Sequence, residues 1–418
     1  MLEHYQIHCK ERMEVGIPPL PLSVQQTSEL VDLLKAEHKE SDLLLELLKE
    51  RTPAGVDQAA YVKAGFLADI TTGKTNSPYI SKKEAVTILG TMLGGYNIQP
   101  LIQCLQDDEL GEEAAIALST TLLIFDAFND VLELSQSNAN AKKVIDAWAE
   151  GLWFTEKKEI PNQIKLTVYK VPGEINTDDL SPATDAWSRP DIPLHALAMF
   201  KMPREGLDKP LETINELEKK GNPLVFVGDV VGTGSSRKSA TNSVLWHMGD
   251  EIPWIPNKKE GGFCFGGKIA PIFFNTLEDS GAFPVECDVS KLNMGQEIIF
   301  EPFNGKILDA NSGEVLSSFE LKTPVLLDEV RANGRIPLII GRQLTDKTRE
   351  ALGLEPTDIF TRPDAEDASD KGFTLAQKMV GKACGVAGIR PGTYCEPCLL
   401  YTSPSPRDEV LSRMPSSA

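Results

Sequence analysis

The sequence predicts a multidomain protein in which an all-helical domain is followed by an α/β domain. The chain has 418 residues, which is enough for two or three domains with sizeable cores. Apolar residues recur at helical spacing through residues 1–158. Alternating or continuously apolar runs, separated by glycine turns, then dominate residues 159–355.

The helical domain is expected to consist of short helical hairpins. Leu30-Val-Asp-Leu-Leu34 has helical apolar spacing, and breaks such as Pro53-Ala-Gly55 separate such segments. The stretch 98–118 is more specific, because a short helix near Pro100 leads through an acidic turn into an alanine-rich helix. This pattern is typical of a HEAT-like hairpin that stacks in a solenoid. An ordinary helical bundle is the alternative, since clean copies at one period do not recur.

The α/β domain is expected to begin near residue 160. Gln163–Val171 alternates with period two, and Pro223–Val231 is a largely apolar, β-branched run, so both predict strands. Further strands are predicted at 284–289, 297–301 and 336–341, and helices at 236–248 and 344–353, with a charged surface helix and loop at 204–221.

Residues 356–397 are expected to form a solvated linker and the truncated start of a further domain, with a short helix at 374–380. Residues 398–418 are rich in proline and serine and resemble a translated sequencing-adapter read. We interpret them as a non-native tail on a truncated gene product. An uninterrupted native frame through these codons would contradict that interpretation.

Charge and cysteine content limit the class of protein. A net charge of −19 argues against non-specific binding to nucleic acid or to an anionic membrane. The N-terminus lacks a signal-peptide pattern, and no apolar run reaches transmembrane length. Seven scattered cysteines indicate free thiols in a reducing compartment. The chain is therefore predicted to be cytoplasmic, with no membrane partner.

The segment Gly232-Thr-Gly-Ser-Ser-Arg237 joins a predicted strand to a predicted helix. A helix N-terminus presents unpaired backbone N–H groups and a positive dipole end. Two hydroxyls, Ser235 and Ser236, and the Arg237 guanidinium lie at that point. The pattern favours a site for a small anion, a carboxylate or a phosphate. A serine-capped helix start without function is the alternative.

Other motif interpretations fail on single residues. A dinucleotide fingerprint needs a third glycine where Arg237 stands, and a P-loop ending at Lys268 needs Ser or Thr where Ile269 stands. Cys395 and Cys398 spell C-x-x-C, but no second pair completes a zinc site. The five histidines form no ligand cluster. No metal ligand is therefore assigned in this chain.

A second loop, Asn176-Thr-Asp-Asp-Leu-Ser-Pro-Ala183 continuing to Asp191, is rich in Asp, Ser and Pro. Asp178 or Asp179 can orient an arginine there, and Arg189 can bind a carboxylate with two parallel hydrogen bonds. A solvated turn is the alternative that composition alone favours.

These two loops, together with Trp187-Ser-Arg-Pro-Asp-Ile-Pro-Leu-His-Ala196, Gly266-Gly-Lys-Ile-Ala-Pro-Ile-Phe-Phe-Asn-Thr276 and Ala60-Tyr-Val-Lys-Ala-Gly-Phe-Leu67, resemble the aconitate hydratase B family, the bacterial-type aconitases. The resemblance runs from residue 1 to about 397. It implies a HEAT-like helical domain (1–158), a swivel α/β domain of β/β/α type (159–355), then a linker and the beginning of an iron–sulfur domain (356–397).

The resemblance implies a hydro-lyase of the tricarboxylic acid cycle, which converts citrate to isocitrate through cis-aconitate and in some members dehydrates 2-methylisocitrate. By motif position, Ser235 matches the catalytic base, Arg189, Ser236 and Arg237 match substrate-binding residues, and Asp178 matches a supporting position. The family carries a 4Fe–4S cluster, whose cysteine ligands are expected outside this chain. The chain alone is therefore expected to be an inactive fragment.

The resemblance also implies partners. The helical domain is associated with homodimers, and the cluster-free protein with RNA binding. Two alternatives from other classes are a partner- or RNA-binding helical-repeat module, and a swivel subunit that acts in trans on a related hydro-lyase.

Overall fold

The computed structural model describes residues 2–362, 371–390 and 395. The chain divides into two compact units. The first comprises Met1–Leu321 and Leu326–Ile359, and the second comprises Lys322–Val325 and Phe360–Ala418. The described part of the second unit contains the short helix α18 (Leu375–Ala383), which begins with a capping box at Thr374.

The N-terminal domain is helical, as predicted. Its elements are α1 (Leu2–Glu14), α2 (Val24–Leu34), α3 (Ser41–Glu46), the π-helix η1 (Leu47–Arg51), α4 (Gln58–Thr71), α5 (Lys82–Gly90), α6 (Ile98–Cys104), α7 (Gly111–Ser119), the 3-10 helix η2 (Phe125–Ala127), α8 (Phe128–Leu134), α9 (Ala139–Glu150) and α10 (Leu152–Thr155).

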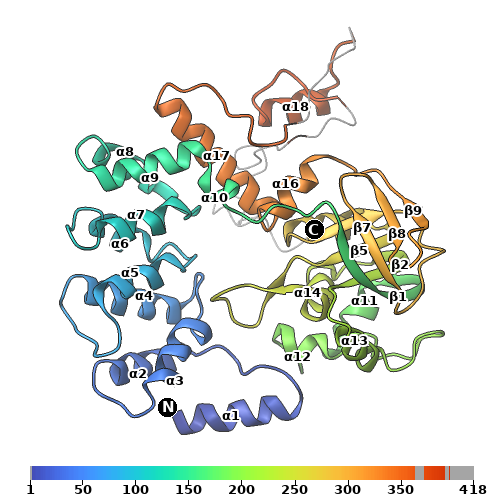
Figure 1. The fold of residues 1–418 in the computed structure, drawn as a ribbon, viewed down its shortest axis with the longest axis horizontal. Helices are drawn as coiled ribbons and strands as arrows, with labels where there is room; N and C mark the ends of the chain where they lie inside the picture. Colours follow the sequence, from blue (N-terminus) through green and yellow to red (C-terminus); the bar gives the residue numbers. More distant parts are fainter. Residues whose placement is uncertain (1, 363–370, 391–394, 396–418) are drawn as a thin grey trace, which may run out of the picture. The chain divides into compact units, whose positions relative to one another are not determined.

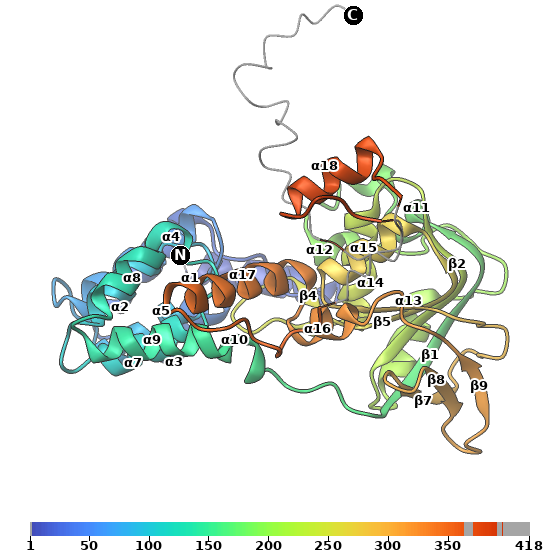
Figure 2. The same cartoon turned by 90° about the horizontal axis from the view of Figure 1, so that it is seen from above.

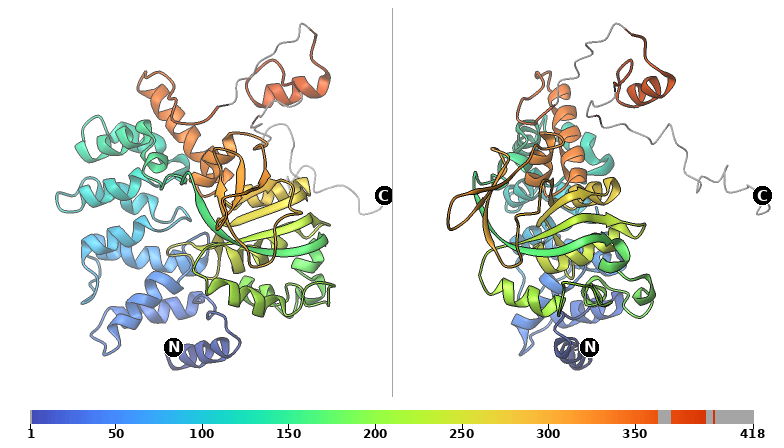
Figure 3. Two further views of the ribbon diagram at one scale, coloured as in Figure 1. Left: turned by 45° about the vertical axis from the view of Figure 1, so that its right-hand side comes forward. Right: turned by 90° about the vertical axis from the view of Figure 1, so that its right-hand side faces the viewer.

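These helices contact their neighbours in order: α2 packs on α4, α4 on α5, α5 on α7, and α7 on α9. Figures 1 and 3 show them stacked one above another, from blue to teal. Small residues allow the close approach, since a Cβ on Gly90 would lie 2.8 Å from the Cβ of Ala117. One continuous apolar core results, with fully buried residues such as Leu30, Leu67 and Leu89.

The second region is built on a seven-stranded mixed sheet with the order β6-β5-β2-β1-β7-β8-β9. Its strands are β1 (Ile164–Asn176), β2 (Leu224–Thr233), β5 (Phe263–Ile269), β6 (Phe283–Glu286), β7 (Glu297–Glu301), β8 (Lys306–Asp309) and β9 (Val315–Ser318). Strands β1, β2, β5 and β6 pair in parallel, whereas β7, β8 and β9 extend the sheet in antiparallel fashion from β1.

The parallel strands are buried on both faces. Side chains alternate between faces along a strand, so Val225 and Val227 enter one core and Phe226 enters the other. The predicted strands at 163–171 and 223–231 are therefore confirmed as the centre of the sheet. The segment that nearly forms a P-loop is the extended strand β5, in which Cys264, Phe265 and Gly266 are buried and Gly267 and Lys268 are exposed.

Helices and short elements flank this sheet: α11 (Thr177–Leu180), the 3-10 helix η3 (Ala183–Asp185), α12 (Ile192–Ala196), α13 (Pro210–Glu218), α14 (Arg237–Met248), α15 (Pro271–Asp279), α16 (Val325–Arg331), and the two-stranded hairpin of β3 (Asp250–Glu251) and β4 (Lys259–Glu260). Helices α11, α12 and α14 contact one another, and α14 also packs on β2 and α15. Figure 2 shows α11, α12, α14 and α15 grouped near one another.

The strand predicted at 336–341 is wrong, because these residues form the first part of the helix α17 (Arg335–Ala351). Leu338, Gly341 and Leu344 are spaced three residues apart and share a buried face. This face packs against α9 and around Trp153, whose indole N–H donates to the Thr345 hydroxyl at 3.0 Å. A Cβ on Gly341 would lie 2.3 Å from the Trp153 ring, so the missing side chain makes room for the indole. The periodicity of this short apolar run fits both a strand and a helix, and tertiary packing determines that it forms a helix.

None of the described helices combines the length and the apolar character that crossing a bilayer requires.

Candidate functional site

The two loops that the sequence analysis singled out meet at the carboxyl ends of β1 and β2. The strands are parallel neighbours, and their last paired residues are Asn176 and Thr233. The chain after β1 turns into α11, and the chain after β2 passes through Gly234 into α14. The backbone N–H of Ser236 donates to the Thr177 hydroxyl at 3.3 Å, which joins the two loops directly.

The two glycines of the second loop are required by its backbone. Gly232 and Gly234 have φ values of +79° and +105°, a region that L-residues with a side chain rarely adopt. A Cβ on Gly232 would lie 2.2 Å from the Phe273 ring, and one on Gly234 would lie 2.5 Å from the Thr177 hydroxyl. The glycines therefore let this loop approach both α15 and the first loop closely.

We expect Gly232→Ala to lower the free energy of unfolding by about 3 kcal/mol. About 1–2 kcal/mol comes from the left-handed backbone and about 1–3 kcal/mol from the clash with Phe273. Gly221→Ala is the matched control, because Gly221 has a φ of +78° and no atom within 4 Å of the added Cβ. Urea unfolding followed by circular dichroism should show the control losing only about 1 kcal/mol. Equal losses would contradict the packing argument.

A cavity of about 330 Å³ lies between the two loops. Its polar wall includes Arg189 and Ser236, and its apolar rim includes Pro182 and Ile192. The other lining residues are Ser181, Ala183, Ala186, Pro190, Asp191, His195, Ser239, Asn242 and Ser243. The N-terminus of the twelve-residue helix α14 lies at this cavity. The cavity thus combines a guanidinium with a helix N-terminus, a combination suited to an anion.

The remaining candidates of the second loop lie beside the cavity rather than in its wall. Ser235 is exposed, and no hydrogen bond of its hydroxyl is found within the described ranges. The Arg237 guanidinium donates to the Gly234 carbonyl at 3.1 Å. Ser236 occupies the N-cap position of α14, but its side chain makes no capping hydrogen bond. Helix capping therefore does not account for the paired serines.

Arg189 is held by an acid that sequence reasoning missed. The Asp185 carboxylate lies 3.3 Å from the Arg189 Nε and 2.9 Å from the Lys201 Nζ. The hydrogen bond from Lys201 is the main cause that lowers the pKa of Asp185 below its ordinary value. Asp185 is 5% exposed, so both cations lie over a nearly buried carboxylate. Asp185 and Arg189 are four residues apart, and this spacing could have indicated the ion pair from the sequence.

The two acids that were considered for this role lie elsewhere. Asp179 forms an ion pair with Arg204 at 3.1 Å. The backbone N–H of Asp178 donates to the Asn176 side chain at 2.6 Å. The arginine that Asp179 orients is therefore Arg204 and not Arg189. The supporting role of Asp178 stays a prediction.

His195 also belongs to this site, although the sequence analysis assigned it no role. Its Nδ1 lies 3.2 Å from the Arg189 carbonyl oxygen, and its Nε2 lies 2.8 Å from the Ser181 hydroxyl. A carbonyl oxygen only accepts, so Nδ1 donates to the Arg189 carbonyl, while Nε2 shares a hydrogen bond with the Ser181 hydroxyl. His195 thus ties the Arg189 main chain to the first loop.

The described residues do not provide ligands for an iron–sulfur cluster. No group of three or more His, Cys, Asp or Glu side chains among them is arranged to hold a metal ion. Burial raises the pKa of Cys264, and it raises the pKa of Cys287 to about 11, which favours protonated thiols. Cys398, the second cysteine of the C-x-x-C pattern, lies outside the described residues. The cluster that the resemblance implies therefore does not fit the residues described.

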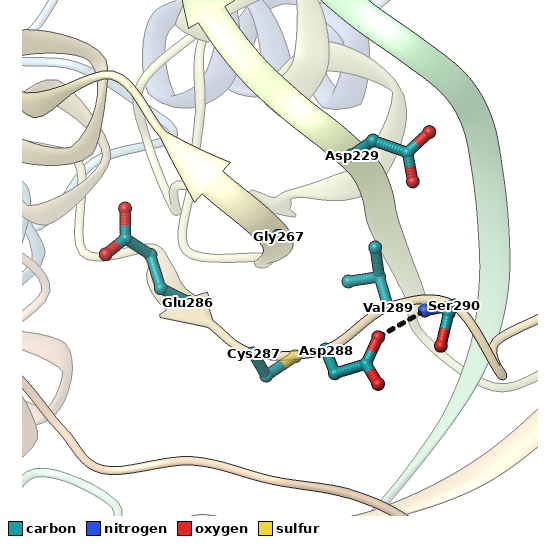
Figure 4. A pocket seen from close by; sticks show the side chains of 7 residues that line it. All are labelled: Asp229, Gly267, Glu286, Cys287, Asp288, Val289 and Ser290. Atoms are coloured by element: carbon teal, nitrogen blue, oxygen red, sulfur yellow. Dashed lines mark hydrogen bonds between the residues drawn. The ribbon is translucent and has the colours of Figure 1, made fainter.

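A second polar cavity, of about 370 Å³, is lined by three acids, and each of them already accepts a hydrogen bond from a nearby backbone N–H (Figure 4). Asp229 accepts from the Gly173 N–H at 2.6 Å, Glu286 from the Ile269 N–H at 2.8 Å, and Asp288 from the Ser290 N–H at 2.9 Å. Figure 4 shows the three carboxylates pointing apart. These acids fix loop backbone and do not converge on a ligand.

Together, the stacked helices, the mixed sheet and the polar cavity define an α/β protein with an N-terminal helical domain. Comparison with known proteins agrees with this class. The family model described as "Aconitate B N-terminal domain" matches residues 4–154, and the one described as "Aconitate hydratase 2 N-terminus" matches residues 166–373.

Full-length relatives give the same result. The chain is 61% identical to the aconitate hydratase B of Synechocystis sp. over 98% of this chain and 48% of that protein. It is 57% identical to the aconitate hydratases B of Pseudomonas aeruginosa and Escherichia coli over 98% of this chain and 49% of each protein. The chain therefore belongs to the aconitate hydratase B family. It spans about half the length of the curated relatives it matches.

A solved structure of 3-isopropylmalate dehydratase from Methanocaldococcus jannaschii overlaps 45% of this chain and 99% of that chain, with 18% identity and a TM-score of 0.34. A likeness at this level supports no argument about the fold.

Proposed function

We propose that this chain supplies the carboxylate-binding and proton-transferring part of an aconitase active site. The substrates are citrate, cis-aconitate and isocitrate. The observation that carries the proposal is the meeting of two loops, one bearing Arg189 and the other Ser235-Ser-Arg237, beside one cavity at a helix N-terminus. A tricarboxylate carries more negative charge than one cation can balance, so two arginines and a helix N-terminus suit it.

In the proposed reaction the residues of this site bind the substrate and transfer its proton. Arg189 and Arg237 bind substrate carboxylates, and Ser236 donates a further hydrogen bond. Ser235 removes the proton from the carbon beside the one that bears the hydroxyl, and the hydroxyl leaves with a solvent proton as water. In the second half of the interconversion water adds its hydroxyl to the carbon that lost the proton, its other proton returns to solvent, and Ser235 returns its proton to the carbon that lost the hydroxyl. A serine hydroxyl is a very weak acid, so the Arg237 guanidinium and nearby N–H groups must stabilise its alkoxide.

We assign the domains on the family resemblance. Residues 1–158 form the HEAT-like helical domain, 159–355 the swivel domain, 356–397 the linker and the beginning of the iron–sulfur domain, and 398–418 the non-native tail. The one-after-another contacts from α2 to α9 support the first assignment. The 4Fe–4S cluster belongs to the remaining part of the enzyme. The homodimer, RNA binding by the cluster-free form, 2-methylisocitrate as a substrate and the cytoplasmic location stay predictions of the resemblance.

A chimera tests the proposal. Residues 1–390 of this chain are joined to the corresponding C-terminal part of the Synechocystis relative, and the product is reconstituted anaerobically with iron and sulfide. We expect the chimera to form cis-aconitate from citrate, detected by ultraviolet absorbance, while this chain alone forms none under the same treatment. Turnover by the chain alone would contradict the assignment of a partial site. A folded, cluster-loaded chimera without activity would contradict the proposed function.

A further inference from the structure

The first helix of the chain makes a nearly buried ion pair with the loop that carries Arg189. The Arg12 guanidinium of α1 donates from Nη1 to the Asp191 Oδ1 at 3.1 Å and from Nη2 to the Asp191 Oδ2. Its Nε donates to the Pro18 carbonyl at 2.8 Å. The side chains of Arg12 and Asp191 are 9% and 17% exposed. A bidentate pair with little solvent fixes orientation as well as distance.

Asp191 is the point from which α12 begins. It is the N-cap residue, and its carboxylate accepts from the Leu194 N–H at 3.4 Å. The same carboxylate therefore holds both the first turn of α12 and the guanidinium of α1. Arg12 acts on the first turn of this short helix, where the chain has no long hydrogen-bonded ladder to fix it.

Helix α12 in turn holds Arg189 at two points. The Arg189 Nη1 donates to the Leu194 carbonyl at 3.2 Å, and the His195 Nδ1–H donates to the Arg189 carbonyl at 3.2 Å. A continuous series of contacts thus runs from Arg12 through Asp191 and α12 to both the side chain and the main chain of Arg189.

The loop before α12 has little apolar packing. Its turn is held by two hydrogen bonds to the Asp185 carbonyl, from the Arg189 N–H at 2.9 Å and from the Ser188 hydroxyl at 3.2 Å. Trp187, two residues before Arg189, is 96% exposed. The Asp185 carboxylate holds the Nε of Arg189. The main chain that follows Arg189 is held instead by α12 and by Asp191, the N-cap residue of that helix. A loop with little buried apolar surface depends on its polar contacts for order.

We propose that Arg12 is a positioning residue for substrate binding: it acts through Asp191 and α12 to hold Arg189 in the orientation that binds a carboxylate. This inference rests on the proposed function for the role of Arg189, but the contact series can be tested without substrate. The helical domain thereby contributes to the site through its first helix, although no residue of it lines the cavity.

The first arm of the test is hydrogen exchange on this chain. Arg12→Met should speed exchange of the Arg189, Leu194 and His195 amides at least about tenfold, because each is hydrogen-bonded within this loop or the first turn of α12. Asp191→Asn should have the same effect, and the double variant should add little to either single change. Arg51→Met is the matched control. Arg51 also contacts the second region, through the Asn257 side chain at 3.0 Å, but at the loop between β3 and β4. We expect it to change those three amides less than about twofold.

The second arm uses the chimera. Arg12→Met should raise KM for citrate about tenfold and leave kcat within about threefold, since Arg189 binds the carboxylate in the ground state and the transition state alike. Arg51→Met should leave both constants within about twofold. Unchanged exchange in Arg12→Met overturns the proposal, and so does faster exchange with an unchanged KM. An inactive parent chimera contradicts the proposed function. In that case the contact series is still supported if Arg12→Met speeds exchange of the three amides and Arg51→Met does not.

Discussion

Ser235→Ala in the chimera is expected to lower kcat about 10²–10⁴-fold, with KM for citrate changed by less than about threefold. This is the range that a positioned general base contributes. Ser235 lies on the exposed part of the loop, between Gly234 and Ser236, the N-cap residue of α14. Its hydroxyl can face a bound substrate from this position. Initial rates of cis-aconitate formation from citrate and of isocitrate formation from cis-aconitate measure the two halves of the reaction, and both should fall together because one group performs both proton transfers.

Ser280→Ala supplies the control. Ser280 follows α15, and its hydroxyl donates to the Thr276 carbonyl at 3.0 Å, away from the cavity. This variant should keep kcat within about twofold, since a surface substitution of this kind rarely costs more than about 0.5 kcal/mol. A Ser235→Ala chimera with nearly full kcat would remove Ser235 from the role of base, even if Arg189 and Arg237 still bind substrate.

The sheet could be predicted from the sequence because its central strands have no competing interpretation. Pro223–Val231 is apolar and rich in valine apart from Asp229, and it forms the strand β2 next to β1, buried over Leu224–Gly228. The run at 336–341 is equally apolar but forms the beginning of α17, because Trp153 packs against Gly341 and donates to the Thr345 hydroxyl four residues further on, which is helical spacing. Trp153 lies almost 200 positions earlier in the chain, so no local pattern could signal this contact.

In the candidate site, too, local sequence patterns could be predicted and contacts between distant residues could not. The loop Gly232-Thr-Gly-Ser-Ser-Arg237 could be found locally, because glycines with positive φ and a following helix leave a pattern in adjacent residues. The partners of Arg189 could not be ranked in the same way. Asp178, Asp179 and Asp185 are all acids within eleven positions of it, and only the fold places Asp185 against the guanidinium and Asp179 against Arg204. Arg12 was missed altogether, since its contact joins residues 179 positions apart.

Lys63→Met is expected to stabilise the chain by about 2 kcal/mol at pH 7. Lys63 lies in α4 with a fully buried side chain, and among the described residues its ammonium donates one hydrogen bond, a long one from Nζ to the Lys49 carbonyl at 3.5 Å. Desolvation lowers the pKa of Lys63 to about 8 from its ordinary 10.5, and the nearby Glu50 offsets this only in part. Methionine keeps the apolar packing and removes the buried charge. A difference of about 2.5 pKa units corresponds to about 3 kcal/mol, from which the lost hydrogen bond subtracts about 1 kcal/mol.

The pH dependence distinguishes this cause from better packing. Between pH 8 and pH 10.5 the folded protein has released the Lys63 proton, whereas the unfolded chain still holds it, so wild-type stability rises with pH in that window. The advantage of Lys63→Met should therefore shrink from about 2 kcal/mol at pH 7 to near zero at pH 9.5 in urea unfolding. Lys142→Met, which removes an exposed ammonium paired with Asp146, should change stability by less than about 0.5 kcal/mol at both pH values. A Lys63→Met variant that is less stable than wild type at pH 7 would mean that the buried ammonium is a net stabilising contact of the helical core.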